Sequence, residues 1–258
     1  MSMLADPVAL LPELERLARL AGAAILEVYA TDFTVERKGD DSPVTEADQK
    51  AEALILPGLK ALTPDIPVVA EEEAAAGRVP AVNGTFWLVD PLDGTKEFIK
   101  KNGEFTVNIG LIKDGVPTAG VVFAPALGVL WSGAGGQAWR EDASGRAAIA
   151  CRKAPASGAV VLDSRSHRAP EKLTAFLAEL NEPCMENAGS SLKFCKVADA
   201  SADFYPRFGP TSEWDTAAGH AVLAAAGGEV VTWDGRPLAY GKPKFLNTDF
   251  LARAKAGH

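Results

Sequence analysis

Residues 86–97 read Phe86-Trp-Leu-Val-Asp-Pro-Leu-Asp-Gly-Thr-Lys-Glu97 and join a run of bulky apolar residues to two aspartates, three positions apart. The apolar run predicts a buried strand, and because strands usually end at polar residues, one aspartate needs no special explanation. A second aspartate, with a rigid proline before it and Gly94-Thr95 after it, favours a turn that directs both carboxylates and the Leu92 carbonyl to one point. Oxygen ligands of this kind, without histidine or thiolate, suit Mg²⁺. The stretch therefore predicts a site for two nearby cations, with Asp90 bridging them.

Three further acidic groups stand where the chain is expected to expose them at the end of an element. They are Glu71, in the acidic residues 71–73 after a strand-like run at 67–70; Asp48, in the first turn of a helix that begins near Glu46; and Asp215, at the start of an apolar helix. Because a neighbouring strand would end at the same edge of the sheet, we expect Glu71 to lie near Asp90.

Each of these acids also has an ordinary explanation when it is taken alone. Asp90 and Asp93 suit a turn, and the run at 71–73 suits a solvated surface. Asp48 with Thr45 resembles a capping box, and Asp215 resembles a helix-capping acid. All of them nevertheless stand at element ends in a sequence without competing soft ligands, and this favours one shared carboxylate site.

Composition narrows the class of protein. The chain has 258 residues, 47% of them hydrophobic and 23% charged, which is typical of a folded chain with one large domain or two packed subdomains. Its 34 acidic and 26 basic side chains give a net charge of −8. This balance offers no overall field for nucleic acid or anionic lipid, so we expect a small-molecule partner.

Cysteine and histidine usage excludes other kinds of site. The three cysteines form no CxxC pair, which argues against a disulfide framework or a structural zinc site and favours a reducing, cytoplasmic setting. Only three histidines are present, and His258 is the last residue, so a histidine-rich metal site is not expected. No segment shows the apolar run of about 20 residues that a membrane-spanning helix needs.

The pattern of apolar residues changes near residue 155. In residues 1–154 we expect an α+β subdomain that carries most metal ligands. Two helices, the first marked by apolar residues from Leu10 to Val28 and the second kinked or ended by Pro57, are expected to cover a largely antiparallel meander. The expected strands are at 67–70, 86–89, 105–112, 118–123 and 129–132. In residues 155–258 alternating strands and helices indicate an α/β subdomain. The expected elements are at 159–162, 171–180, 192–198, 204–208, 216–226 and 229–232. We expect a cleft between the two halves.

Two stretches, residues 87–95 and 214–220, resemble the signatures of the inositol monophosphatase superfamily of metal-dependent, lithium-sensitive phosphomonoesterases. The resemblance covers nearly the whole chain and implies the layered αβαβα sandwich of the inositol monophosphatase and fructose-1,6-bisphosphatase type. Narrower features resemble the branch that acts on 3'(2'),5'-bisphosphate nucleotides. They lie at 41–48, 94–99, 164–167, 189–195 and 205–211.

The resemblance implies a role for each matching residue. Glu71, Asp90 and the Leu92 carbonyl would hold one Mg²⁺, and Asp90, Asp93 and Asp215 a second, with two or three ions in each active site. A water on the first ion would be the nucleophile, Thr95 and Asp48 would accept its proton, and Glu71 would belong to the catalytic set. Ala70 stands where relatives often carry Ser or Gly, which leaves Glu71 or Glu72 open as the ligand.

The same resemblance predicts how substrate is held. Gly94 and Thr95 would hold the scissile phosphate, beside Asp93 and Asp215. Ser191 and Lys193 would contact the retained phosphate, although Lys193 could also be an ordinary solvated helix lysine. The nucleotide portion would lie against Ser164, Ser166 and His167.

The expected reaction is hydrolysis of 3'-phosphoadenosine 5'-phosphate to AMP and phosphate, within sulfur metabolism, with 3'-phosphoadenylyl sulfate, giving adenylyl sulfate, as a second candidate substrate. An inositol or other sugar phosphatase would use the same metal centre, and a nucleotide sensor would bind without hydrolysis. The intact set of Asp48, Asp90, Asp93, Thr95 and Asp215 argues against the sensor. Relatives include monomers and homodimers, and some associate peripherally with the inner membrane, although no anchor or basic amphipathic helix marks this sequence.

Overall fold

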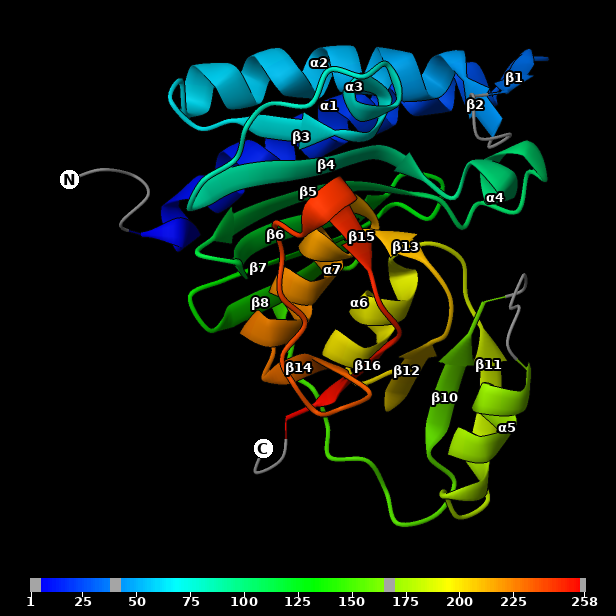
Figure 1. The fold of residues 1–258 in the computed structure, drawn as a ribbon. Coiled ribbons are helices and arrows are strands. Elements are labelled where there is room, and N and C mark those ends of the chain that lie inside the picture. The colour runs from blue at the N-terminus through cyan, green and yellow to red at the C-terminus, as the bar shows by residue number, and fades with distance from the viewer. Residues whose placement is uncertain (1–5, 38–42, 165–169, 256–258) are drawn as a thin grey trace.

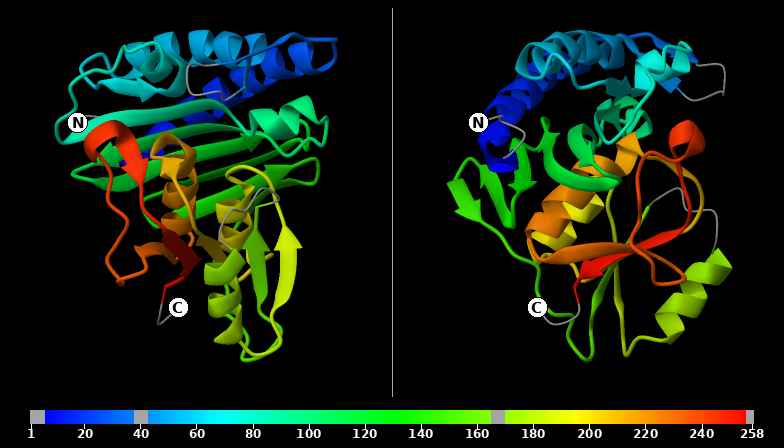
Figure 2. Two further views of the ribbon diagram at one scale, coloured as in Figure 1. Left: turned by 45° about the vertical axis from the view of Figure 1, so that its right-hand side comes forward. Right: turned by 60° about the vertical axis from the view of Figure 1, so that its left-hand side comes forward.

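Five layers build the molecule in the computed structural model, which describes residues 6–37, 43–164 and 170–255. In Figure 1, α1 and α2 lie at the top, followed by a first sheet, a pair of helices, a second sheet and one outer helix. The helices of these layers are α1 (Leu11–Tyr29), α2 (Glu46–Leu62), α6 (Leu192–Ala198), α7 (Trp214–Ala225) and α5 (Pro170–Ala178). The expected αβαβα sandwich is confirmed, and the two turned views in Figure 2 show the same succession.

The first sheet has the order β3-β4-β5-β6-β7-β8-β9 in the part of the chain that is described. Its strands are β3 (Val68–Ala70), β4 (Thr85–Asp93), β5 (Thr106–Lys113), β6 (Val116–Ala124), β7 (Val129–Ala134), β8 (Gln137–Asp142) and β9 (Gly145–Ala148). All neighbours from β4 to β9 are antiparallel, whereas β3 pairs parallel with β4. The predicted meander is confirmed. It extends into β8 and β9, which were not predicted because their residues are mostly polar or small and partly exposed.

The central strands are buried on both faces, which explains their continuous apolar sequence. Along β4, Trp87 and Val89 face the core beneath α1 and α2, while Phe86 and Leu88 face the core around α6 and α7. The predicted helical face of α1 is buried as expected, and α2 continues past Pro57, so this proline does not end the helix.

The second sheet has the order β11-β10-β12-β16-β14 among the described residues. Its strands are β10 (Val160–Asp163), β11 (Cys184–Asn187), β12 (Phe204–Arg207), β14 (Gly228–Thr232) and β16 (Phe250–Ala254). The predicted α/β alternation is present, but β11 and β16 were not predicted. β11 has the mixed sequence Cys-Met-Glu-Asn and little burial, so it carries no apolar signal.

Helix α7 packs closely on the first sheet because both surfaces carry small residues. A Cβ atom at Gly110 would come within 2.9 Å of Ala217 and of the Ala218 backbone, a distance that real side chains do not tolerate. Gly110 therefore permits α7 to lie directly on β5, and this contact brings the start of α7 to the end of β4.

The remaining elements connect the layers. They are η2 (Pro7–Leu10), β1 (Val35–Arg37), β2 (Pro43–Thr45), α3 (Glu71–Ala75), α4 (Thr95–Ile99), β13 (Thr211–Ser212), η3 (Pro243–Phe245) and β15 (Leu246–Asn247). One buried cluster contains side chains from both sides of residue 155, such as Val122 and Phe194, so the halves share a core. The division at 154/155 into two subdomains stays a prediction.

Candidate active site

The end of β4 departs from regular pairing at the two aspartates. Asp90 pairs with Asn108 and Asp93 with Thr106, so the ladder is irregular between them, at Pro91 and Leu92. The Leu92 N–H donates to Asp90 Oδ1 at 3.0 Å. The strand thus continues to Asp93 with a bulge, instead of ending at Val89 as expected, and the bulge brings Asp90 and Asp93 to the same cavity.

Glu71 reaches this point from the neighbouring strand. Because Ala70 of β3 pairs with Val89 of β4, Glu71 and Asp90 follow at the same sheet edge, and a hydrogen bond links their side chains. Asp215 comes from the second residue of α7, where its Oδ2 accepts from the Ser212 N–H at 2.9 Å. We call Glu71, Asp90, Asp93 and Asp215 the acidic floor of the cavity.

The acidic floor is electrostatically unfavourable without a cation. Burial, followed by the negative charges of Glu71, Asp93 and Asp215, raises the pKa of Asp90 well above its ordinary value. Burial also raises the pKa of Asp93 to about 6 and that of Asp215 well above its ordinary value. Buried carboxylates that repel one another are a donor set that a divalent cation would neutralise.

The donor set therefore fits magnesium by its chemistry: four carboxylates and, at Leu92, a backbone carbonyl face one cavity. Within the described ranges, no three Asp, Glu, His or Cys side chains form a ready-made metal-binding group. The fit thus rests on the hard oxygen donors and on their shared burial.

Asp48 and Thr95 meet beside the acidic floor. Thr95 Oγ1 lies 3.3 Å from Asp48 Oδ1 and 3.4 Å from the Leu92 carbonyl. The other oxygen of Asp48 accepts from the backbone N–H and the hydroxyl of Thr45, both at 2.8 Å. Asp48 therefore forms the capping box of α2, and its other oxygen is directed at Thr95; its role as a proton acceptor stays a prediction.

Gly94 permits the close approach of the loop that faces it. It has a φ of 92°, and a Cβ atom there would lie 2.1 Å from Ser190 Oγ. That hydroxyl lies 2.8 Å from the carbonyl oxygens of Asp93 and Glu104, and the Glu104 carboxylate accepts from the Gly189 N–H at 2.8 Å. A side chain at position 94 would push this loop away from the cavity.

Basic and hydroxyl groups line the side of the cavity that the second sheet provides. Lys193 is only 3% exposed, which excludes the solvated lysine, and two of its N–H donors bond the carbonyls of Ala188 and Ser190 at 3.0 and 2.8 Å. Burial lowers the pKa of Lys193 to about 8. Arg207 Nη1 donates to Ser164 Oγ at 3.4 Å. We call Lys193, Arg207 and Ser164 the basic wall; all three line the cavity.

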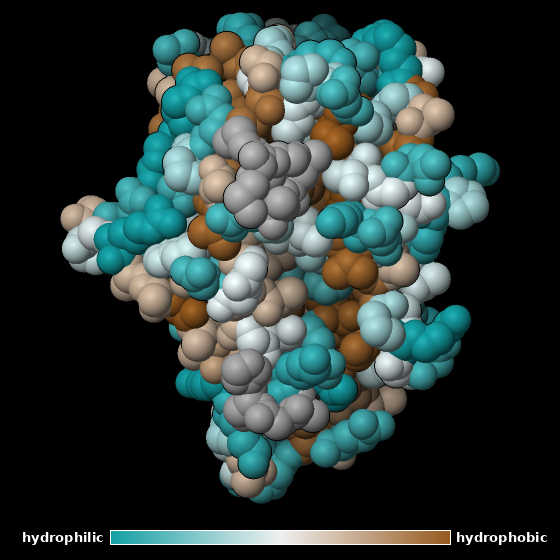
Figure 3. All heavy atoms as spheres, turned by 90° about the vertical axis from the view of Figure 1, so that its left-hand side faces the viewer, coloured by the Kyte–Doolittle hydropathy of each residue, from teal (hydrophilic) through white to brown (hydrophobic). Residues whose placement is uncertain are grey.

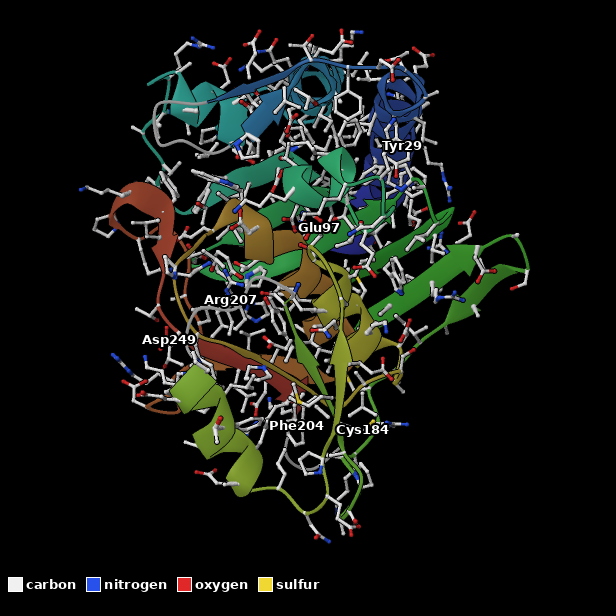
Figure 4. All side chains as sticks on the ribbon, turned by 90° about the vertical axis from the view of Figure 1, so that its right-hand side faces the viewer. Tyr29, Glu97, Cys184, Phe204, Arg207 and Asp249 are labelled. Carbon is white, nitrogen blue, oxygen red and sulfur yellow. The ribbon has the colours of Figure 1, made fainter. Side chains whose placement is uncertain are left out.

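Arg207 was not among the predicted site residues. Its Nε is buried and has no hydrogen-bond partner among the described residues, so the guanidinium retains a donor for a ligand. Figure 4 shows Arg207 in the middle of the molecule together with Glu97, which also lines the cavity. The sequence offered a signal, since Arg207 lies in the motif at 205–211, but no spacing rule pointed to its side chain.

Ser191 lies deeper than expected. It is 1% exposed, and its hydroxyl lies 3.1 Å from Asp93 Oδ2 and 2.8 Å from the Asp215 carbonyl. It thus ties the acidic floor to α7, and its contact with substrate stays a prediction. Ser166 and His167 lie outside the described residues.

The acidic floor and the basic wall face a single cavity of about 340 Å³, which is within the size range of small-molecule sites. The fold and this site define a class of protein: the chain belongs to the inositol monophosphatase family, whose model matches residues 8–257. The chain is 52% identical, over 93% of its own length and 98% of the relative's, to the 3'(2'),5'-bisphosphate nucleotidase CysQ of Salmonella typhimurium.

Solved structures agree with this family. CysQ from Bacteroides thetaiotaomicron is 36% identical, with a TM-score of 0.79 over 94% of this chain and 96% of that one. An inositol monophosphatase from Anabaena is 26% identical, with a TM-score of 0.74 over 96% and 90%. The fold is therefore shared by relatives named for different substrates, and the cavity must supply the argument for one of them.

No helix within the described ranges is long and apolar enough to cross a membrane. Figure 3 shows hydrophobic residues on one face of the molecule only in small patches between hydrophilic ones.

Proposed function

We propose that the chain is a Mg²⁺-dependent phosphomonoesterase that hydrolyses 3'-phosphoadenosine 5'-phosphate to AMP and phosphate. The observation that carries this proposal is the joining of the acidic floor and the basic wall in one cavity. A substrate with two phosphates needs a centre that activates one of them and a separate cationic group that binds the other. The identity to the Salmonella typhimurium nucleotidase supports the same substrate class.

The acidic floor would hold the metal. Bound by Glu71, Asp90, Asp93, Asp215 and the Leu92 carbonyl, Mg²⁺ would neutralise phosphate charge and lower the pKa of the attacking water. The two or three ions of the prediction, and the choice of Glu71 over Glu72, belong to this proposal; Glu71 is favoured because it, and not Glu72, lines the cavity.

Thr95 and Asp48 would move the proton. As the water oxygen bonds to phosphorus and the bond from phosphorus to the ribose oxygen breaks, Thr95 would accept the water proton and pass its own to Asp48 Oδ1, 3.3 Å away, and the leaving ribose oxygen would take a proton from solvent. Thr45 holds the second Asp48 oxygen and so fixes the carboxylate in place. Gly94 and Thr95 line the cavity and would hold the scissile phosphate.

The basic wall would bind the retained 5'-phosphate. Lys193 has two of its three donors bound to backbone carbonyls, which positions the ammonium, and Arg207 has its Nε unsatisfied in the described structure. Ser164 accepts a hydrogen bond from Arg207, lines the cavity, and would contact the nucleotide together with Ser166 and His167. The same wall would accept 3'-phosphoadenylyl sulfate, whose sulfated 5'-phosphate is also anionic. We propose a cytoplasmic setting, consistent with free thiols at Cys151, Cys184 and Cys195.

The test is phosphate release from 3'-phosphoadenosine 5'-phosphate and from inositol 1-phosphate, with Mg²⁺ and with chelator. We expect Mg²⁺-dependent release that strongly prefers the nucleotide, and inhibition by Li⁺. A preference for inositol 1-phosphate would make the chain a sugar phosphatase with the same acidic floor. Binding of the nucleotide without release would indicate the sensor.

A further inference from the structure

Helix α3 begins at Glu71 but lacks a cap of its own. A helix usually begins after Ser, Thr, Asp or Asn, whose side chain accepts from the second or third N–H of the helix. Here the preceding residue is Ala70, which is extended (φ −120°, ψ 150°) and has no side-chain oxygen to accept these bonds. The N–H groups of Glu72 and Glu73 therefore need an acceptor from elsewhere in the molecule.

Glu52 of α2 supplies this acceptor. Its Oε2 accepts from the Glu72 N–H at 2.9 Å, and its Oε1 accepts from the Glu73 N–H at 3.1 Å. These two donors are the ones that a local cap would bind, so one carboxylate twenty residues away caps α3 with both oxygens. Glu52 is 5% exposed, and Figure 1 shows α3 lying against α2.

The same face of α2 also carries Asp48, one helical turn before Glu52. Asp48 contacts Thr95, and Glu52 holds the turn that begins with Glu71. Helix α2 therefore carries both Asp48, which contacts Thr95 beside the acidic floor, and Glu52, which binds the two backbone N–H groups that follow Glu71.

We propose that Glu52 is a positioning residue, which caps α3 from α2 and thereby holds Glu71 in the orientation needed to bind the metal. This inference rests on the proposed function, because it assumes that Glu71 is a metal ligand. It also accounts for the start of α3 after Ala70, which has no side-chain acceptor: the cap comes from another helix.

A purely structural role is less consistent with the surroundings of Glu52. Burial, reinforced by the charges of Glu72 and Glu73, raises the pKa of Glu52 to about 7, although the two backbone hydrogen bonds oppose this rise. Burial thus opposes the charged form of Glu52, whereas the Glu72 and Glu73 N–H groups favour that form. The proposed role of Glu52 in orienting Glu71 gives a reason for a buried glutamate at this position.

The experiment compares the full-length wild type with Glu52→Ala, Glu52→Gln and the double variant Glu52→Ala/Ala70→Ser, in which serine restores a local cap. Ala70→Ser alone serves as its background, and Glu46→Gln is the matched control, an exposed glutamate on α2 that pairs with Lys50. The first readout is Mn²⁺ binding, followed by electron paramagnetic resonance. The others are the Mg²⁺ concentration for half-maximal phosphate release, the nucleotide KM, and the melting temperature in chelator.

We expect Glu52→Ala to weaken Mn²⁺ binding about 10-fold or more, since partners behind metal ligands commonly contribute 10–100-fold to affinity. The nucleotide KM should stay within about twofold, because the basic wall is not altered. Glu52→Gln keeps one acceptor oxygen, so its Mn²⁺ affinity should lie between those of Glu52→Ala and wild type. If Glu52→Ala does not fold, Glu52→Gln becomes the decisive variant. Ala70→Ser should restore most of the lost Mn²⁺ affinity.

Unchanged Mn²⁺ binding in a folded Glu52→Ala or Glu52→Gln variant would overturn the positioning role, as would a lower melting temperature with intact metal binding. Wild-type protein that binds no Mn²⁺ would instead contradict the proposed function and, with it, this inference.

Discussion

The acidic floor and the basic wall face the same cavity but are built differently. The floor comes from the ends of β3 and β4 and from the first turn of α7, where sheet pairing and helix packing place the acids. The wall comes from α6, the end of β12 and the residue after β10. Burial and neighbouring negative charges raise the pKa values of Asp90, Asp93 and Asp215, whereas Lys193 is held by carbonyl oxygens of the loop beside it.

We infer from this difference that the floor and the wall have separate roles. In the proposed mechanism, elements of the first sheet and α7 would hold the metal, while the second sheet and α6 would distinguish one phosphate ester from another. If this inference is correct, changes in the floor should abolish turnover of every substrate. Changes in the wall should affect only substrates that have a second phosphate.

The largest effect is expected for Asp90→Asn. Asparagine has the same shape and can still accept from the Leu92 N–H, so the fold should survive, but the floor loses one of the carboxylates proposed to bind the metal. We expect kcat to fall by about 10³-fold or more on both 3'-phosphoadenosine 5'-phosphate and 3'-AMP. Circular dichroism and steady-state kinetics, with the exposed Asp65→Asn as control, test this. Near-normal turnover would remove Asp90 from the mechanism.

A smaller and selective effect is expected for Lys193→Met. Loss of a charge-assisted hydrogen bond of about 1.5–3 kcal/mol corresponds to about 10–100-fold in kcat/KM for 3'-phosphoadenosine 5'-phosphate. For 3'-AMP, which lacks the 5'-phosphate, the loss should stay below about threefold. Lys196→Met, on the same helix but paired with Glu186, is the control. Equal losses of kcat/KM on both substrates would contradict the separate roles proposed for the floor and the wall.

The pH dependence of binding should report the same lysine. Because burial lowers the pKa of Lys193 to about 8, the ammonium is present below that pH and is lost above it. The KM for 3'-phosphoadenosine 5'-phosphate should therefore rise several-fold as the pH passes through about 8, and the Lys193→Met variant should lack this rise. A wild-type KM that stays flat to about pH 9.5 would contradict the assignment of Lys193 to phosphate binding.

The smallest effect concerns the stability of the metal-free protein. Burial raises the pKa of Asp93 from 3.8 to about 6, so the folded state holds this proton more tightly than the unfolded state. The free energy of unfolding in chelator should therefore fall as the pH rises from about 4 to about 6. Asp93→Asn should remove part of this decline and raise the melting temperature near pH 7 by about 2–4 °C. An unchanged or lower melting temperature would show that the floor tolerates its charges without a cation.

The sequence predicted the floor better than the wall for a physical reason. Asp90, Asp93 and Asp215 stand at the ends of strongly apolar runs, whose periodicity predicts where elements end and therefore where acids gather. Arg207 ends β12, and only the pairing order of the second sheet brings it to Ser164. Spacing along the chain contains no such information.

The same limit explains the missed strands and the long-range cap. Residues 184–187 form β11 because β10 offers them a parallel edge, and not because their own sequence favours a strand. From the sequence alone, Glu52 is an ordinary polar residue of an amphipathic helix. Its contact with α3 appears only when the two helices are placed side by side. By contrast, the Thr45 capping box is local, and the sequence predicted it correctly.

The central claim is tested most directly by the ratio of kcat/KM for 3'-phosphoadenosine 5'-phosphate to that for 3'-AMP, since these substrates differ only in the 5'-phosphate. With Mg²⁺ and wild-type protein, we predict a ratio of about 10²-fold or more that collapses in the variant with both Lys193→Met and Arg207→Gln. Equal kcat/KM values in the wild type would show that the basic wall does not bind a second phosphate and would contradict the account.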